Sequence, residues 1–413
     1  MFSGLSSDTQ DHLRLQGFSG ELGCAAVDTS CGLDVYVGLG QSMTPRTLTR
    51  VTPSALPRIP AGTEVEITGV PDSLLGVVRR ALLGAGLRPL GEDATDKIIS
   101  QAITKAKEWT NAPGADLHPE AFAEEARLVA AASGLNIGVL QAKDLEVGGF
   151  GSLLSVGQGS RFQPLLVDLT HSPSNPVATI TLVGKGITFD TGGLSLKSPT
   201  SMMGMRMDKA GAAVVLAVLE AVGRLGLPVA VRGLLPLAEN MAGPMATRPG
   251  DVITARNGKK VQILDTDFEG RLVMADAIAY AAEKPSDAII DIATLTYQVS
   301  IALGNDVAGL FSNSDGIASQ LLSASEKAGE NLWRLPLVDE YRSQVHAPQG
   351  LKNHPEMDVG RAITAALFLE EFVPSGTPWA HIDCTGPAWS GPASALGATG
   401  FGVHTLMTYL TGL

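Results

Sequence analysis

The sequence from Val183 to Lys197 reads V-G-K-G-I-T-F-D-T-G-G-L-S-L-K. Two later segments share its character: M-R-M-D-K-A-G-A-A from Met205 to Ala213, and D-T-D-F-E-G-R-L-V-M-A-D-A from Asp265 to Ala277. All three place charged residues among glycines and small apolar residues. A buried charge without a partner is costly or changes its protonation, so something must compensate these charges. The pattern therefore indicates a buried charged site rather than an ordinary core.

We single out seven of the charged residues in these segments. Four are carboxylates and three are bases, in chain order Lys185, Asp190, Lys197, Asp208, Asp267, Glu269 and Arg271. Two divalent cations would balance the four carboxylates. None of the seven histidines of the chain lies between Val183 and Ala277. Carboxylate-rich sites without histidine favour hard or borderline ions such as Mn²⁺, Mg²⁺ or Zn²⁺, so we expect a pair of divalent metal ions.

The three bases have different uses in such a site. A lysine can bind a metal ion only when it is neutral, and a nearby dication in a dry site lowers its pKa. The other lysine and the arginine would keep their charge and hold a bridging hydroxide, a polarised carbonyl oxygen or a small anion. Because a two-metal centre activates water and stabilises a developing oxyanion, the expected reaction is hydrolysis of an amide or a phosphate ester.

Length and composition set the broad class. The chain has 413 residues, of which 45% are hydrophobic, so we expect two or three domains. Its net charge of −12 argues against nucleic acid as a partner. The sparse cysteines Cys24, Cys31 and Cys384 predict reduced thiols and a cytoplasmic location. Met1 to Gly17 lacks the pattern of a secretory signal, and the apolar stretch from Ala210 to Val222 is too short to span a membrane.

The chain divides into three predicted parts. Residues 1–95 form a small α/β N-terminal domain, with strands over Val35–Val37 and Glu64–Val70 and a helix over Leu74–Leu83. Residues 96–111 form a connecting helix, which stops at the Asn-Ala-Pro-Gly sequence that begins at Asn111. Residues 112–413 form the catalytic domain. The role of the first domain stays open between assembly and control of access.

Strand and helix patterns alternate through the third part. Expected strands are Ile137–Gln141, Pro164–Leu169, Val177–Val183, Val229–Leu235, Ala288–Ala293 and Trp379–Ile382. Expected helices are Pro119–Ser133, Gly211–Leu225, Leu272–Glu283, Ile363–Phe372 and Val403–Leu410. Asn257-Gly258 predicts a hairpin between Val252–Ala255 and Lys260–Ile263. The alternation predicts an α/β fold with a mostly parallel sheet and helices on both faces. Ligands in such sheets bind beyond the carboxyl ends of the strands, where the charged motifs stand.

The motifs resemble the signatures of the leucyl (cytosol) aminopeptidases, which are two-metal exopeptidases. The resemblance runs from about Lys107 to the C-terminus, and the spacing of all seven charged residues agrees with the family pattern. Five further stretches carry it: L-L-S-V-G-Q-G-S at 153–160, D-I-A-T-L-T at 291–296, L-W-R-L-P-L at 332–337, I-T-A-A at 363–366 and G-A-T-G-F-G-V at 397–403.

This resemblance implies a ligand set for two divalent ions, Mn²⁺ or Zn²⁺. Lys185, Asp190, Asp208 and Glu269 would hold the tighter ion. Asp190, Asp267 and Glu269 would hold the more exchangeable ion, with Asp190 and Glu269 bridging the two. The implied substrate is a peptide with a free N-terminus, and its α-amine would bind a metal and Asp208.

The resemblance also implies catalytic and pocket residues. Lys197 would polarise the scissile carbonyl and steady the gem-diolate, while Arg271 would hold a bicarbonate ion that acts as general base on the bridging water. Met205, Thr294 and Tyr297 would line the pocket for the first side chain of the substrate. Family members assemble as hexamers with active sites facing an interior cavity, which implies a homohexamer. No membrane partner is expected, because the longest apolar stretch is too short to span one.

The chain departs from the family at four positions near the motifs. The family usually has Asn at Asp265, Ala at Phe268, a small or apolar residue at Lys209 and Gly at Tyr297. The first region is also shorter than in typical members. These departures bear on specificity more than on chemistry.

Two alternatives of a different class stay open. One is a catalytically idle assembly or binding homologue that kept the fold, which the complete set of seven charged residues argues against. The other is a two-metal phosphoesterase, which lacks its usual histidine ligands here. Bound metal measured together with hydrolysis of aminoacyl-anilides would separate all three functions.

Overall fold

A computed structural model describes most of the chain. The described residues are 25–28, 34–37, 62–65, 67, 70, 72–91, 93–390 and 397–413. Cys24, Cys31 and the segment from Met1 to Gly17, on which predictions were made above, lie outside them. Among the described helices, none combines the length and the apolar character that crossing a bilayer requires.

Contacts divide the chain into two compact units. The first contains Met1–Gln101 and Ser325–Glu330, and the second contains Ala102–Ala324 and Asn331–Leu413. The first division falls inside helix α4 (Ala94–Asn111), which overlaps the helix predicted over residues 96–111. The predicted domain limits stay a prediction.

The first unit contains short strands and one amphipathic helix. Strands β1 (Ala25–Asp28) and β2 (Asp34–Val37) pair antiparallel. Strand β3 (Glu64–Val65) pairs in parallel with β4 (Arg88–Pro89) and ends well before the predicted limit of Val70. Helix α3 (Asp72–Gly84) supplies most of the buried cluster, which consists of Leu74, Val77, Val78, Leu82 and Leu87.

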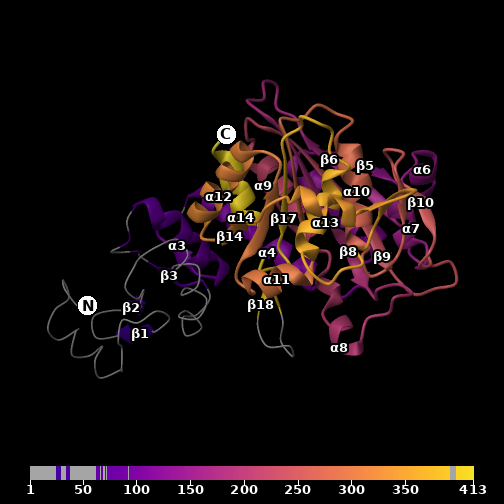
Figure 1. Cartoon of the computed structure of the whole chain (residues 1–413). Coiled ribbons are helices and arrows are strands. Elements are labelled where there is room, and N and C mark those ends of the chain that lie inside the picture. The colour runs from indigo at the N-terminus through magenta and orange to yellow at the C-terminus, as the bar shows by residue number, and fades with distance from the viewer. Residues whose placement is uncertain are drawn as a thin grey trace. The chain divides into compact units, whose positions relative to one another are not determined.

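A sheet of nine strands is the centre of the second unit (Figure 1). Its order is β14-β13-β17-β12-β7-β9-β6-β5, and β8 also pairs with β9. The strands are β5 (Asn136–Leu140), β6 (Leu165–His171), β7 (Thr179–Gly184), β8 (Gly186–Asp190), β9 (Ala230–Asn240), β12 (Ala288–Ala293), β13 (Ala308–Ser312), β14 (Leu332–Arg334) and β17 (Trp379–Asp383).

Most neighbouring strands of this sheet are parallel, as predicted. The pairs β17–β12, β12–β7, β7–β9, β8–β9 and β13–β14 are parallel. The pairs β13–β17, β9–β6 and β6–β5 are antiparallel. The parallel strands at the centre are buried on both faces, which explains their continuous apolar sequences.

Helices cover both faces of the sheet (Figure 1). On one face, α9 (Ala210–Leu225) packs on β7, β9 and β12 and against α5 (Pro119–Ser133) and α14 (Val403–Thr411). On the other, α10 (Gly270–Ala281) packs on the same strands and against α7 (Gly151–Gly157) and α13 (Arg361–Glu370). Helix α9 is apolar nearly all round because it lies between the sheet and other helices.

The remaining elements are short or peripheral. The hairpin predicted at Asn257-Gly258 is confirmed: β10 (Val252–Thr254) pairs antiparallel with β11 (Lys260–Gln262). The other helices are α6 (Ala142–Val147), α8 (Pro199–Met202), η1 (Met205–Met207), α11 (Tyr297–Leu303), α12 (Asp315–Ala328) and η2 (Asp339–Gln344). The other strands are β15 (His346–Ala347), β16 (Gly350–Lys352), β18 (Trp389–Ser390) and β19 (Gly397–Ala398).

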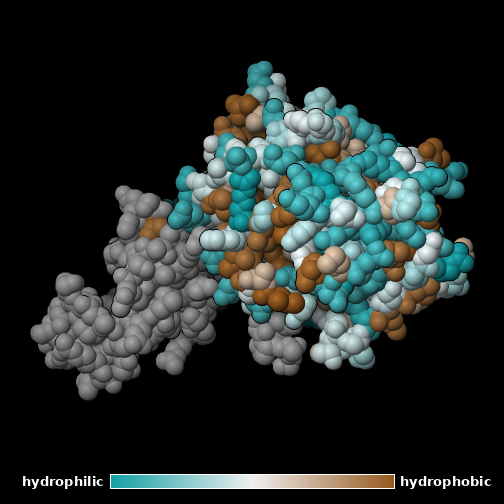
Figure 2. All heavy atoms as spheres, in the orientation of Figure 1, coloured by the Kyte–Doolittle hydropathy of each residue, from teal (hydrophilic) through white to brown (hydrophobic). Residues whose placement is uncertain are grey.

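The surface drawn in Figure 2 is mostly hydrophilic, with several apolar patches. One patch lies over the region of α11, where Tyr297 and Ile301 are 71% and 68% exposed. The two residues stand four positions apart and so share one side of the helix. This side of α11 faces solvent in the single chain.

Candidate metal centre

The charged motifs meet where the parallel strands end. Lys185 follows β7 directly and Asp190 is the last residue of β8. Glu269 precedes the first residue of α10, and Thr294 follows β12 directly. Because carboxyl ends of parallel strands lie at one edge of the sheet, residues far apart in the sequence come together there, as predicted.

The loop after β8 turns sharply to bring Lys197 back to the strand end. Gly192 and Gly193 have φ values of +85° and +64°, a region that residues with a side chain rarely adopt. The Lys197 amide donates to the Thr191 carbonyl at 2.9 Å, which closes the loop. The two glycines of D-T-G-G therefore make the turn that returns Lys197 to Asp190.

Lys185 is surrounded by acceptors. Its Nζ lies 2.7 Å from Asp208 Oδ2 and 2.9 Å from Glu269 Oε1, and it donates to the Thr294 carbonyl at 2.9 Å. Burial alone would lower the pKa of Lys185, but the neighbouring carboxylates outweigh burial and raise it. A Cβ on Gly270 would stand 2.7 Å from this Nζ, so a larger residue there would displace the end of the Lys185 side chain from its acceptors.

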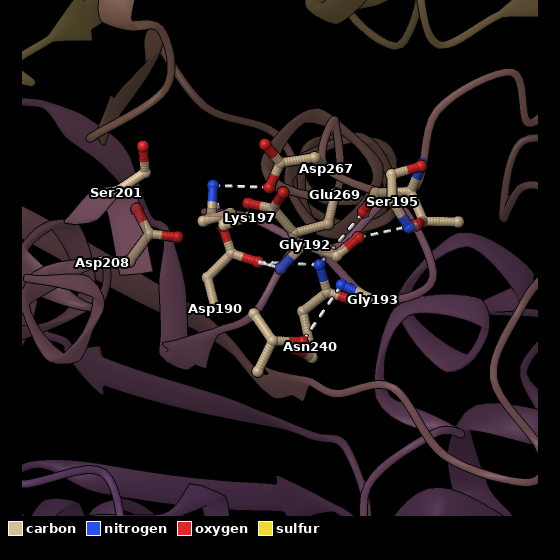
Figure 3. Close-up of polar contacts among 12 residues, drawn as sticks. Asp190, Gly192, Gly193, Ser195, Lys197, Ser201, Asp208, Asn240, Asp267 and Glu269 are labelled. Atoms are coloured by element: carbon tan, nitrogen blue, oxygen red, sulfur yellow. Dashed lines mark hydrogen bonds and ion pairs between the residues drawn. The ribbon is translucent and has the colours of Figure 1, made fainter. Parts of the chain in front are cut away.

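Lys197 joins the other two carboxylates (Figure 3). Its Nζ lies 2.9 Å from Asp190 Oδ2 and 2.5 Å from Asp267 Oδ1. Its side chain is 14% exposed, against 3% for Lys185. Burial opposes the charge on Lys197, while Asp190, Glu269 and Asp267 raise its pKa, so the ammonium form is favoured. Lys197 is thus the more accessible of the two bases.

The carboxylates are close enough to bind cations together. Asp190, Asp267 and Glu269 each offer an oxygen atom, and these atoms lie within 4.8 Å of one another. Burial raises the pKa of Asp208 and of Asp267 to about 7, and neighbouring carboxylates add to the shift. Burial and Glu269 also raise the pKa of Asp190. Only in Glu269 do the lysines outweigh burial and lower the pKa. Carboxylates that repel one another in this way fit divalent cations.

Arg271 is buried and incompletely paired. It is 3% exposed, and its Nη1 atom has no hydrogen-bond partner among the described residues. Burial lowers the pKa of Arg271 to about 9, while Glu269 opposes the shift. The guanidinium carbon lies 4.7 Å from the centre of the Phe268 ring. A buried guanidinium group with a free donor suits a small anion.

Asn240 belongs to the site but was not predicted from the sequence. It is 4% exposed, and its Nδ2 donates to Asp190 Oδ1 at 2.8 Å and to the Thr266 carbonyl at 3.0 Å (Figure 3). The amide of Gly192 donates to the same Asp190 oxygen at 2.9 Å. The expected strand ended at Leu235, whereas β9 continues to Asn240. The signal was present as the polar pair Glu239-Asn240 after an apolar run.

The predicted pocket residues lie in different environments. Thr294 is buried, and its hydroxyl donates to Asp208 Oδ1 at 2.7 Å. Met205 is half-buried and opens the turn η1 that leads to Asp208. Tyr297 is the first residue of α11 and is 71% exposed. The structure thus places Thr294 beside the charged cluster, while the roles of Met205 and Tyr297 stay predictions.

Two residues that differ from the family pattern, Asp265 and Phe268, also make contacts in the site. Asp265 accepts a hydrogen bond from the Asp267 amide at 2.8 Å, through its Oδ1 atom. Phe268 packs edge-on against His354, with ring centres 4.5 Å apart. Asp265 therefore shapes the turn before Asp267, and the Phe268 ring lies against the Arg271 guanidinium.

A cavity of about 600 Å³ lies apart from the charged cluster. Phe189 and Glu239 line it, and they pair with each other in β8 and β9. The next residues, Asp190 and Asn240, also pair with each other. Since successive side chains of a strand point to opposite faces, the cavity and the charged cluster lie on opposite sides of these strands.

The fold and the site together define a class: an α/β protein whose central sheet carries a cluster of carboxylates and lysines suited to divalent cations. Residues 104–407 match the catalytic domain of the Cytosol aminopeptidase family. The chain belongs to this family.

Relatives and solved structures agree with this assignment. The chain is 44% identical over 319 residues to a probable cytosol aminopeptidase of Chlorobaculum tepidum, covering 76% of this chain and 63% of the relative. It is 43% identical over 313 residues to one of Streptomyces coelicolor, covering 75% and 60%. The chain therefore spans about three-fifths of the length of these relatives. A structure of the bottromycin maturation enzyme BotP in complex with Mn has a TM-score of 0.91 and 34% identity, covering 99% of this chain and 97% of that one.

Proposed function

We propose that the protein is a metal-dependent aminopeptidase that removes the N-terminal residue of peptides. The observation that carries this proposal is the convergence of two lysines and four carboxylates at the carboxyl ends of β7 and β8 and at the start of α10. All six residues lie within 104–407, the part of the chain that matches the family's catalytic domain. On this basis we propose both the activity of the whole protein and its peptide substrate.

Two divalent ions would be held by the ligand set that the family resemblance implies. Lys185, Asp190, Asp208 and Glu269 would hold the tighter ion, and Asp190, Asp267 and Glu269 the exchangeable one. Without metal the effect of burial is outweighed by the carboxylates, which raise the pKa of Lys185, so Lys185 would release its proton to solvent as the ion binds. Such ions, when bound, supply Lewis-acid activation of water and neutralise negative charge in the transition state. We propose Mn²⁺ as the first ion to test, because BotP was solved with Mn and is 34% identical; Zn²⁺ is the second.

Asp208 gives the site its requirement for a free N-terminus. Its carboxylate would accept a hydrogen bond from the α-amine of the substrate. Oδ1 of Asp208 is already held by the Thr294 hydroxyl at 2.7 Å and by Lys185 at 2.8 Å, so its position is fixed before the substrate binds. A peptide with a blocked amine would lose this contact.

Lys197 would act on the scissile carbonyl. Its ammonium is held between Asp190 and Asp267, and the neighbouring carboxylates keep it protonated. It can therefore donate a hydrogen bond to the carbonyl oxygen as negative charge develops there. A donor that is already oriented stabilises the transition state more than the ground state.

Arg271 would hold a small anion close to the reacting groups. Its buried guanidinium group has a free donor at Nη1, and Phe268 covers one of its faces. Bicarbonate is the anion we propose, because it could accept a proton from the attacking water as general base. Met205, Thr294 and Tyr297 would line the pocket for the first side chain of the peptide.

Assembly and location complete the proposal. We propose a homohexamer on the basis of the family resemblance alone. We propose a cytosolic location because relatives at 40–44% identity are described as cytosol aminopeptidases. We propose no nucleic acid or membrane partner for the protein.

The test combines metal analysis with a panel of aminoacyl-anilides. Chelated protein should hold no metal and should not cleave the anilides, and Mn²⁺, Zn²⁺ or Co²⁺ should restore two ions per chain and activity together. The matched control is the same anilide with an acetylated amine, which should not be cleaved. A phosphate ester offered in parallel tests for a phosphoesterase. Metal binding without cleavage of any substrate would support the idle homologue, and full activity in metal-free protein would contradict the proposal.

A further inference from the structure

Lys209 is an unusual buried base beside the metal centre. It is fully buried, at 0% exposure, and it lies directly after Asp208. Lys185 and Lys197 each pair with two carboxylates. Among the described residues, by contrast, no carboxylate oxygen lies within ion-pair distance of Lys209 Nζ.

Main-chain oxygens surround the Lys209 side chain instead. Its Nζ donates to the Arg206 carbonyl at 2.7 Å, to the Ala112 carbonyl at 2.8 Å and to the Thr188 carbonyl at 3.5 Å. An ammonium group has three protons and no acceptor, which matches three carbonyls and no donor. Carbonyl oxygens arranged in this way can also bind a small monovalent cation, because they replace the water molecules of its hydration shell.

We propose that Lys209 is a tethered cation that fills a monovalent-cation site, and that it positions the turn leading to Asp208. The three carbonyls belong to different parts of the second unit. Arg206 lies in η1, Ala112 follows α4 directly and Thr188 lies in β8. A single ammonium group therefore ties the turn to two segments that flank it.

The turn carries two groups that matter to the proposed reaction. Met205 opens η1, and Asp208 closes it, with the Asp208 amide 3.4 Å from the Met205 carbonyl. A small shift of the turn would move Asp208 away from Lys185 and Thr294. The contacts of Lys209 Nζ are with main-chain oxygens, so Lys209 is a positioning residue. Its effect on catalysis rests on the role proposed for Asp208, whereas its effect on the fold does not.

The main variant is Lys209→Met, which keeps an apolar chain of similar length and removes the cation. It is studied with tetramethylammonium as the only monovalent cation, and K⁺ or NH₄⁺ is then added. Without a small cation we expect a lower melting temperature than wild type and a kcat/KM about 10- to 100-fold lower, because small misplacements in an active site have effects of this size. K⁺ and NH₄⁺ should restore both in a saturable way, since either ion fits among the carbonyls.

Two controls make the result specific. Wild type and Lys143→Met, a change at an exposed lysine, should not respond to K⁺. The proposal would be overturned if Lys209→Met, in tetramethylammonium alone, had the same activity and melting temperature as wild type. Losses that neither K⁺ nor NH₄⁺ restores would also overturn it, because they would mean that the side chain acts only through packing.

Measuring the melting temperature needs no substrate. It therefore tests the cation site independently of the proposed aminopeptidase function. If the activity assay fails in wild type but K⁺ still stabilises Lys209→Met, the cation site stands and the aminopeptidase proposal falls. If Lys209→Met cannot be recovered folded, Lys209→Gln replaces it. The Gln amide keeps two donors without a charge, and we expect K⁺ to raise its melting temperature by a smaller amount. A Gln variant that ignores K⁺ would contradict the proposal.

Discussion

Asn240 lies opposite Asp190 in the parallel pairing of β8 with β9, and its amide nitrogen donates to Asp190 Oδ1 at 2.8 Å. The same nitrogen also reaches the carbonyl of Thr266, one residue before Asp267. One buried amide thus fixes a carboxylate at a strand end and the loop that carries another. Groups that orient metal ligands in this way tune the affinity of the site without binding the metal.

Replacement of Asn240 should therefore weaken metal binding. In Asn240→Ala, Asp190 loses one of the two neutral donors that hold its Oδ1 atom, and we expect metal affinity to fall by about 10- to 100-fold. Titration of Mn²⁺ into metal-free protein measures this. The control is Asn305→Ala, at an exposed asparagine. Unchanged affinity in Asn240→Ala would show that Gly192 alone holds Asp190 in place.

The two lysines should respond differently to removal. Lys197→Ala should lower kcat by about 10²- to 10³-fold with metal content intact, because its ammonium is proposed to act in the transition state. Lys185→Ala should lose the tighter metal, since Lys185 lies against Asp208 and Glu269. Elemental analysis of both variants beside their kinetics checks this. If Lys197→Ala loses metal and Lys185→Ala keeps it, the roles are reversed.

The stabilising effect of Mn²⁺ should grow as pH rises. The pKa values of Asp208 and Asp267 are raised from 3.8 to about 7, so the folded chain binds more protons than the unfolded chain between about pH 4 and 7. The stability these two groups contribute without metal is therefore lost as pH rises through that range. A divalent ion displaces the same protons, so its binding strengthens over the same range.

Melting temperatures with and without excess Mn²⁺ at pH 5, 6 and 7 check this dependence. The increase in melting temperature that Mn²⁺ produces should be larger at pH 6 than at pH 5, and larger again at pH 7. Asp276 is a useful comparison, because burial raises its pKa to about 7 as well, but it accepts bonds from the amides of Leu153 and Arg256. Asp276→Asn should change the melting temperature both with and without Mn²⁺, and it should leave the difference between these two temperatures unaltered. A constant difference in wild type would contradict the assignment of Asp208 and Asp267 to the metals.

Tyr297 tests the specificity pocket. The residue is 71% exposed, so its side chain is free either to border the pocket or to face away from it. If it borders the pocket, Tyr297→Gly should raise the preference for leucyl over alanyl substrates by more than about tenfold, because one methylene is worth ~1–3 kcal/mol in such pockets. The ratio of kcat/KM values for the two anilides measures this. An unchanged ratio would leave specificity to Met205 and Thr294.

The sequence predicted the centre of the fold better than its edges. Strand Ala288–Ala293 and helix Pro119–Ser133 have the predicted limits, because burial gives them a strong apolar pattern and Pro119 and Gly134 mark the ends of the helix. Strand β8 was missed, since G-I-T-F-D is short and carries the polar residues of the site. Strand β13 and helix α12, at one side of the sheet, were not predicted either.

The same contrast holds for the site. The seven charged residues stood out because charge among glycines is rare in a core, and six of them converge in one cluster of ion pairs. Arg271 lies beside this cluster, two residues after Glu269. Asn240 was missed because its signal, the polar pair Glu239-Asn240 after an apolar run, is weaker than charge among glycines. The contacts of Lys209 were not foreseen because three backbone carbonyls leave no trace in the sequence.

Gly270 has a consequence for protein engineering. A Cβ at this position would push the end of the Lys185 side chain away from its carboxylates, so we expect a library that randomises the residue to lose activity in most members. The start of α10 is therefore a part of the gene that directed evolution should leave unchanged. Met205 and Tyr297 are half-buried or exposed and have no such steric limit. A search for variants with new substrate preference can concentrate its diversity there and keep the metal centre intact.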